Sequence, residues 1–204
     1  MLPFGHTAVA YLIAQIPRWR GRALNRAETL LVLFCGSIFD LDLLALALLG
    51  IPGALHHYYP GHTPLLGLVW LGFLYIVLRR SFPRRVFFWA GLAMLGHLIC
   101  DDLSYWFSLC GLEHPVTQPQ IFWLFPLDPR HLPELRYAWE VYLQQRPTWQ
   151  TFLNWYLVSR PLLFYLETSV VLIALVIFLR NRGKLAPADR EKEKGQNHIG
   201  FDPR

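Results

Sequence analysis

The chain has 204 residues, of which 54% are hydrophobic and only 16% are charged, well below the ~25% of ordinary soluble domains. Its net charge of +5 would suit a nucleic-acid partner, but the arginines stand at the ends of apolar segments, as the cytoplasmic loops of membrane proteins require. The composition therefore argues against a nucleic-acid partner and for an integral membrane protein, and the three cysteines, which lack C-x-x-C spacing, predict neither a disulfide framework nor a thiolate metal site.

Apolar stretches predict the helices in chain order. Residues 2–16 are short for a membrane span, since crossing ~30 Å of hydrocarbon takes about 20 helical residues, and predict a tilted span or an interfacial helix. Further apolar helices are predicted over 28–50, 64–78, 86–112 and 161–180. The mixed segment 113–160, rich in Trp, Tyr and Pro, predicts short interfacial helices. The predicted fold is all-α: an integral membrane helical bundle with four to five spanning helices and short interfacial helices.

The charge pattern predicts the domain boundary and the orientation. Residues 1–182 form the membrane domain, and the charged tail, residues 183–204, is expected to be disordered. The connector 17–27 and the turn 79–85 each carry four arginines, whereas the loop 51–63 carries no Lys or Arg. By the positive-inside rule, the two arginine-rich segments and the tail lie in the cytoplasm, and the loop 51–63 faces outward.

Histidines and acids stand in or beside these apolar stretches, where each costs at least a few kcal/mol and usually has a function. They are His6, Asp40, Asp42, His57, His62, His97, Asp101, Asp102 and Glu167. Counting ~1.5 Å per helical residue from the cytoplasmic end, Asp40 lies roughly 18 Å deep, His97 roughly 16 Å and Asp101 roughly 22 Å. Glu167 reaches roughly 20 Å. The polar groups therefore converge in the outer half of the bilayer.

Spacing indicates which groups can share an ion. His97 and Asp101 are four apart and lie on one helix face, so they can bind one ion together. Asp102 points about 100° away and is expected to orient a ligand or to cap a kink in the helix. Asp40 and Asp42 are two apart and face nearly opposite sides, so one is predicted to be a ligand and the other an orienting or second-ion group.

The remaining groups extend this site. His57 and His62 are five apart in a loop bent by a Pro-Gly pair, which allows both imidazoles to turn toward one ion. Glu167 is an isolated acid in a predicted span, and it could ligate a second ion, accept a proton or pair with an arginine. Imidazole and carboxylate ligands predict one or two divalent ions, Zn²⁺ first and Mn²⁺ as an alternative. Asp102 or Glu167 would be the catalytic proton acceptor.

The order of these motifs resembles that of the membrane-bound metal-dependent hydrolase family, the YdjM-like proteins of bacterial inner membranes. The matching elements fall within roughly residues 1–180: G-His6-T, F-Asp40-L-Asp42, His57-Y-Y-P-G-His62-T, His97-L-I-C-Asp101 and the aromatic stretch QIFWLFPLD. Phe39 stands where the family has the proline of P-D-x-D, and Tyr58 and Tyr59 replace an Arg and a Gly of its histidine loop.

The resemblance implies a metal-dependent hydrolase of the bacterial inner membrane, and the charge pattern predicts that its site lies toward the outer face. The family is distantly similar to bacterial zinc phospholipase C, which implies a phosphoester substrate such as a lipid head group. The ligand set by itself suits a metal-activated water that attacks such a bond. The predicted interfacial helices of 113–160, rich in Trp and Tyr, would cover the outer side of the site, which suits a lipid or another amphipathic substrate.

Two alternatives remain open. A metal-free lipid phosphatase with a histidine nucleophile would use the PGH at 60–62 and the HxxxD at 97–101, but it also needs Lys and Arg for the phosphate, and a Ser-Arg where this chain has FWAGLAMLG. An ion- or proton-coupled transporter would use the same polar groups as an ion path. The small size of the chain and its lack of an internal repeat argue against a transporter.

Overall fold

The computed structural model describes residues 3–42, 60–113, 119–127 and 160–196, and the single residues 48, 57, 140, 150, 154, 157 and 158; it describes side chains as far as residue 182. The helices are α1 (Pro3–Trp19), α2 (Arg26–Ser37), α4 (Pro64–Leu78), α5 (Arg84–Asp101), α6 (Leu103–Leu109) and α9 (Pro161–Gln196), with a 3-10 turn η2 (Pro60–His62) before α4. No strand occurs in these ranges, so the predicted all-α class is confirmed.

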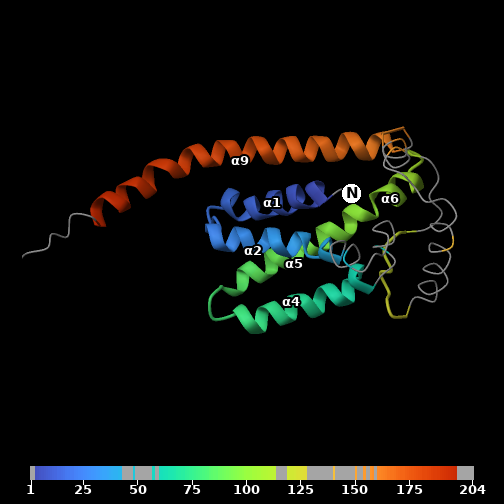
Figure 1. Ribbon diagram of the computed structural model, residues 1–204, viewed down its shortest axis with the longest axis horizontal. Helices are drawn as coiled ribbons and strands as arrows, with labels where there is room; N and C mark the ends of the chain where they lie inside the picture. The colour runs from blue at the N-terminus through green and yellow to red at the C-terminus, as the bar shows by residue number, and fades with distance from the viewer. Residues whose placement is uncertain are drawn as a thin grey trace, which may run out of the picture.

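The helices form a bundle in which α1, α4 and α9 run one way and α2 and α5 run the opposite way (Figure 1). α1, α2 and α5 pack against one another, α4 packs against α5, and α9 runs along α1. Both short connections, α1 to α2 and α4 to α5, lie at one end of the bundle, which we call the arginine end because both are rich in arginine. The start of α1 and the ends of α2 and α5 meet at the opposite end. The topology therefore separates the arginines of these two connections from the polar groups on α1 and α5.

The core lies between α1, α2 and α5, where small side chains allow close packing. Ala10, Val32, Val86 and Ala90 are fully buried there. A Cβ added to Gly36 would lie 2.4 Å from the Cβ of Ala10, so no larger residue fits at this crossing of α1 and α2. The core thus brings the first turn of α1 close to the end of α2.

The structure agrees with some predicted helix limits and changes others. The predicted helix over 64–78 coincides with α4, which begins at the N-cap Thr63. The predicted helix over 86–112 is broken at Asp102 into α5 and α6, whose axes differ by 53°. α9 continues to Gln196 across the predicted boundary with the tail. Most of the segment 113–160, where short interfacial helices are predicted, lies outside the described residues, as do most of residues 43–59.

Fewer helices than predicted are long and apolar enough to cross a membrane. Among the described helices, the 22 residues Pro161–Arg182 of α9 qualify, and the bent pair of α5 and α6 adds a second if it counts as one span. α2 ends at Ser37, well before the predicted limit of residue 50, and α4 is apolar but has only 15 residues. Only 17% of the apolar part of α9 is buried, so α9 is not a core helix of the described bundle. Its exposed apolar surface is typical of a helix that contacts lipid or a partner.

Candidate metal centre

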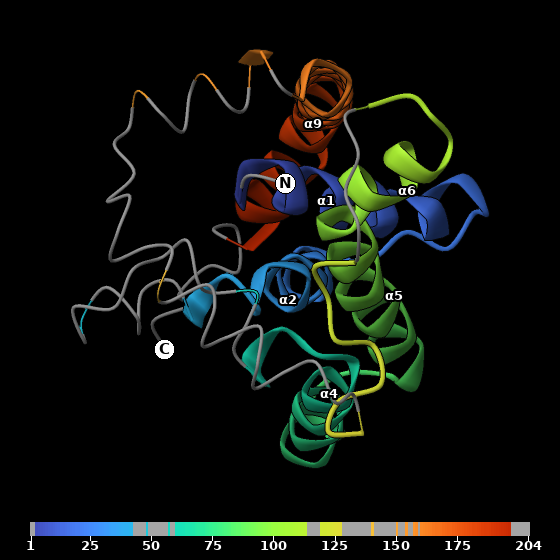
Figure 2. The same cartoon turned by 90° about the vertical axis from the view of Figure 1, so that its right-hand side faces the viewer.

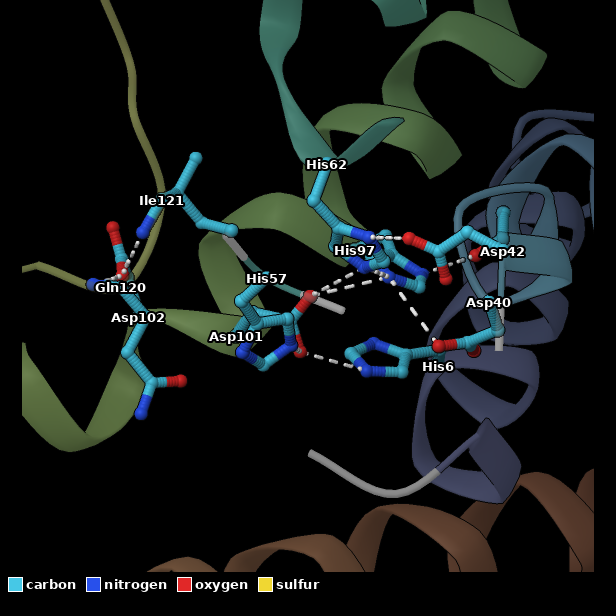
Figure 3. Close-up of polar contacts among 11 residues, drawn as sticks. His6, Asp40, Asp42, His57, His62, His97, Asp101, Asp102, Gln120 and Ile121 are labelled. Atoms are coloured by element: carbon cyan, nitrogen blue, oxygen red, sulfur yellow. Dashed lines mark hydrogen bonds and ion pairs between the residues drawn. The ribbon is translucent and has the colours of Figure 1, made fainter. Parts of the chain in front are cut away.

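The side chains predicted as metal ligands gather into one group (Figure 3), at the end of the bundle where α1 begins and α5 ends. We call this group the His–Asp cluster: His6, Asp40, Asp42, His57, His62, His97 and Asp101. His6 comes from the first turn of α1, the pair of acids follows α2, His62 ends η2, and His97 and Asp101 come from the last turns of α5. Four separate segments of the chain therefore contribute to one site.

Asp101 lies at the centre of the cluster, and each of its oxygens faces a different pair of imidazoles. Oδ1 lies 2.9 Å from His6 Nε2 and 3.5 Å from His57 Nε2. Oδ2 lies 3.1 Å from His97 Nε2 and 3.6 Å from His62 Nε2. The contact with His97 spans one helical turn, as the HxxxD spacing predicts. One carboxylate thus connects two histidine pairs.

Each of the His62 and His97 rings is oriented by a hydrogen-bond acceptor at its Nδ1 atom. His62 Nδ1 donates to Asp42 Oδ2 at 2.9 Å, and His97 Nδ1 donates to the carbonyl oxygen of Gly36 at 2.8 Å. In a neutral ring whose Nδ1 carries the proton, Nε2 presents a lone pair. The two Nε2 atoms lie 3.3 Å apart, and both face Asp101 Oδ2. Three electron-pair donors, the two Nε2 atoms and Asp101 Oδ2, therefore face the same point between the three side chains.

Burial keeps at least one of these rings neutral. The side chain of His62 is fully buried, and burial, together with the nearby His57, holds the pKa of its imidazole well below the ordinary 6.5. The neutral imidazole is the form that binds a metal ion. At neutral pH, His62 can therefore offer its Nε2 lone pair without losing a proton.

Asp40 and Asp42 take different places in the cluster. Asp40 Oδ1 lies 3.8 Å from His97 Nε2, on the side where the lone pairs meet, whereas Asp42 binds the outer nitrogen of His62. Both acids reach the cluster because the α-helix does not continue: after Ser37, three successive amides bond to the carbonyl three residues back. Asp40 Oδ2 is buried and has no hydrogen-bond partner within the described part of the chain.

Three overlapping sets of side chains could each hold a metal ion. In each set, one ligand atom per residue lies within 4.8 Å of the others, and the sets are His6–His97–Asp101, Asp40–His62–His97 and His57–His62–Asp101. The exposed fractions show where the cluster is open: 16% for the side chain of His57, 11% for Asp40 and 19% for Asp42, against at most 1% for the remaining members. Water or a substrate would therefore approach past His57, Asp40 and Asp42.

Asp102, predicted as a proton acceptor, faces away from the cluster (Figure 3). Its Oδ1 accepts hydrogen bonds from the amides of Gln120, at 2.6 Å, and Ile121, at 3.1 Å, and its Oδ2 accepts one from Trp123 Nε1 at 2.6 Å. The fully buried carboxylate thus ties residues 120–123 to the break between α5 and α6. These three donors indicate an anchoring role for Asp102 rather than proton transfer.

Glu167, the other predicted proton acceptor, lies against the first turn of α1. It is only 5% exposed, although most of α9 is not buried. A Cβ added to Gly5 would lie 2.6 Å from Glu167 Oε1, so the carboxylate rests on the backbone next to His6. Glu167 is therefore a neighbour of the His6 segment and belongs to none of the three candidate ligand sets.

Sequence patterns missed two residues that shape the site: Gly36, whose carbonyl oxygen accepts from His97, and Gly5, which leaves room for Glu167. The aromatic stretch QIFWLFPLD includes Trp123, but nothing in the sequence identified Asp102 as the partner of its indole. A backbone acceptor has no signature in the residue type, and a glycine in an apolar helix does not identify its partner.

Comparison of the chain with protein-family models, with curated protein sequences and with solved structures finds no match. The resemblance to the membrane-bound metal-dependent hydrolases therefore rests on the order and spacing of the motifs. The geometry of the His–Asp cluster is the structural feature that indicates a function.

Proposed function

We propose that the chain is a membrane-bound, metal-dependent hydrolase whose centre is the His–Asp cluster. One observation carries the proposal: the Nε2 atoms of His62 and His97 lie 3.3 Å apart beside Asp101, while their Nδ1 atoms donate to Asp42 and to Gly36. Metal-binding histidines usually donate their second nitrogen to a carboxylate or a backbone carbonyl in this way. Facing lone pairs repel each other, and a cation between them removes that repulsion.

The donor set indicates which ions fit. The side chains of Asp40, His62, His97 and Asp101 would hold one ion, and His6 and His57, on the other oxygen of Asp101, would hold a second. Nitrogen and oxygen donors in this mixture suit Zn²⁺, with Mn²⁺ as the alternative. We propose one or two ions, with Asp101 connecting the two positions.

The side chains of the cluster would fix the geometry of the metal ligands and position a water molecule or a substrate oxygen. A divalent ion bound here would lower the pKa of a water ligand toward neutrality and polarise a phosphoryl oxygen. Asp42 and the Gly36 carbonyl fix the planes of the two imidazoles, so the ligand geometry needs no rearrangement. Asp40 and His57, at the open side, are placed to hydrogen-bond a water molecule or a substrate oxygen. The carboxylates would repel an anionic substrate, so phosphoester binding would depend on the ion.

The exposed surface supports a place in the membrane. α4 and α9 lie at opposite edges of the bundle (Figure 2), and their large apolar side chains are exposed, for example Leu68 and Ile76 on α4 and Leu172 and Leu179 on α9. We propose that these edges contact lipid in a multi-pass arrangement of four to five spans. The arginine end would face the cytoplasm and the cluster the outer side of a bacterial inner membrane. A lipid or another amphipathic phosphoester is the substrate class that such a site would meet.

A histidine nucleophile is less well supported. Such a mechanism needs an imidazole nitrogen that is open to the substrate. His62, which occupies the PGH position, is fully buried, and its Nε2 faces His97 rather than the open side of the cluster.

Elemental analysis tests the proposal. Protein purified in detergent without chelators should carry about one or two equivalents of Zn or Mn per chain, as dinuclear and mononuclear hydrolases do. His62→Ala and His97→Ala should lose this metal together with phosphodiesterase activity toward a fluorogenic lipid. His198→Ala, a histidine of the C-terminal tail, is the matched control and should keep both. Wild-type protein without stoichiometric metal would overturn the proposal.

A further inference from the structure

Glu167 is a buried acid on α9, a helix of which only 17% of the apolar part is buried. Its neighbours Thr168 and Ser169 are exposed, whereas Glu167 itself is 5% exposed. A Cβ built on Gly5 would lie 2.6 Å from its Oε1, 2.8 Å from its Cδ and 2.9 Å from its Cγ. Three consecutive atoms of the Glu167 side chain therefore occupy the space that a side chain at position 5 would need. This contact exists only because residue 5 is a glycine.

The first turn of α1 is a favourable environment for a buried carboxylate. The first four amides of an α-helix have no partner within the helix and carry partial positive charge. α1 has no acidic residue in its own first turn, which begins at Pro3. The Glu167 carboxylate, which lies on Gly5 of that turn, places an acidic group of a neighbouring helix beside these amides.

His6 follows Gly5 directly, so the contact acts on a member of the cluster. His6 is 2% exposed; its Nε2 lies 2.9 Å from Asp101 Oδ1, and its ring stacks on that of His97 with centroids 3.7 Å apart. On its other side, α1 is set by the tight contact of Ala10 with Gly36. The start of α1 is thus held between α2 and α9.

We propose that Glu167 is a positioning residue: through Gly5 it holds the first turn of α1 so that His6 reaches Asp101, and it thereby couples α9 to the metal centre. The inference rests on the proposed function only in taking His6 as a metal ligand. The contact between Glu167 and Gly5 can be tested without any metal.

A double-mutant cycle in the unfolding of metal-free protein tests the contact. Gly5→Ala should lower the Tm, because its methyl group collides with Glu167, and Glu167→Asp should restore part of that loss by withdrawing the carboxylate. Gly72→Ala on α4 is the matched control, since a Cβ there meets nothing within 4 Å among the described residues. The Tm of the Gly72→Ala variant should not fall. Additive effects of Gly5→Ala and Glu167→Asp would overturn the proposed contact.

A titration with Co²⁺ of chelator-stripped protein tests the positioning. His6→Ala should alter the visible Co²⁺ spectrum and weaken binding, and Gly5→Ala and Glu167→Gln should reproduce that change with a loss of about 10- to 100-fold in affinity. The double variant Gly5→Ala/Glu167→Asp should recover part of it. If Gly5→Ala and Glu167→Gln bind Co²⁺ with the wild-type spectrum and affinity, the inference is wrong. If the wild type binds no Co²⁺, the proposed function fails instead, and the double-mutant cycle still decides the contact.

Discussion

The Nε2 atoms of His62 and His97 lie 3.3 Å apart, and each ring is held from behind by a different kind of acceptor. For His62 the acceptor is the side chain of Asp42, and for His97 it is the backbone carbonyl of Gly36. A substitution can remove the first acceptor directly, whereas the second can be changed only by moving the helix. The two halves of the site should therefore respond to different mutations.

Asp42→Asn should weaken metal binding without abolishing it. The amide keeps the shape of the carboxylate but lacks its charge, so His62 becomes a weaker base and a less well-oriented ligand. Loss of such an outer partner typically lowers metal affinity by about 10- to 100-fold. Competition with a chromophoric chelator measures the change, and His198→Ala again serves as the unaffected control. Wild-type affinity in Asp42→Asn would contradict the role of Asp42.

Gly36→Ala should disturb the contact between α1 and α2. Its Cβ would lie 2.4 Å from that of Ala10, and such overpacking typically costs about 1–3 kcal/mol of unfolding free energy. Ala10→Gly in the same chain should recover part of the loss by removing the colliding methyl group. Denaturant unfolding in detergent measures both effects. Gly36→Ala with wild-type stability would show that the helices do not approach so closely.

The stability of the metal-free protein should fall as the pH drops below about 6.5, the ordinary pKa of histidine. Burial holds the pKa of His62 well below that value in the folded state, so only the unfolded state takes up the proton as the pH falls. Proton uptake by the unfolded state favours unfolding.

The comparison that isolates His62 is the unfolding free energy at about pH 7.5 and about pH 5.5 for wild type and His62→Gln. The variant should lose less stability over this interval than the wild type. His198→Gln should behave as the wild type does. An equal pH dependence in His62→Gln and wild type would rule out His62 as a source of the effect.

Trp123→Phe should destabilise the protein and leave its metal content unchanged. The substitution removes the indole N–H that binds Asp102 Oδ2 at 2.6 Å, and an unsatisfied buried carboxylate oxygen costs about 1–3 kcal/mol. Trp106→Phe on α6, where the indole is 46% exposed, is the matched control and should change stability by less than about 0.5 kcal/mol. A loss of metal in Trp123→Phe would instead place Asp102 in the metal centre.

Cysteine labelling should place the two ends of the bundle on opposite sides of the membrane. In a chain whose native cysteines are replaced, Leu127→Cys stands at an exposed position that ends the segment 119–127, and Figure 1 shows this segment at the cluster end. Arg22→Cys stands at an exposed position of the connection between α1 and α2, at the arginine end. An impermeant maleimide added to intact bacterial spheroplasts should label position 127 and should label position 22 only after permeabilisation. The reverse pattern would invert the proposed orientation.

Local sequence patterns predicted the features that belong to a single helix. The limits of α4 follow from the Thr63–Pro64 start signal and the arginines after Leu78. The approach of His97 to Asp101 follows from their spacing of one helical turn. The all-α class follows from apolar stretches that are too long for strands. Each of these needs only the periodicity of one segment, which the residue order contains.

The tertiary structure alone decided which groups meet. That Asp101 faces two histidine pairs, that Asp42 rather than Asp40 holds His62 from behind, and that Asp102 is an anchor all depend on contacts between separate segments. These contacts are set by how closely helices approach at Gly5 and Gly36 and by backbone acceptors, neither of which has a pattern along the chain. The sequence determined that costly polar groups lie at one end of an apolar bundle, and packing determined what they form there.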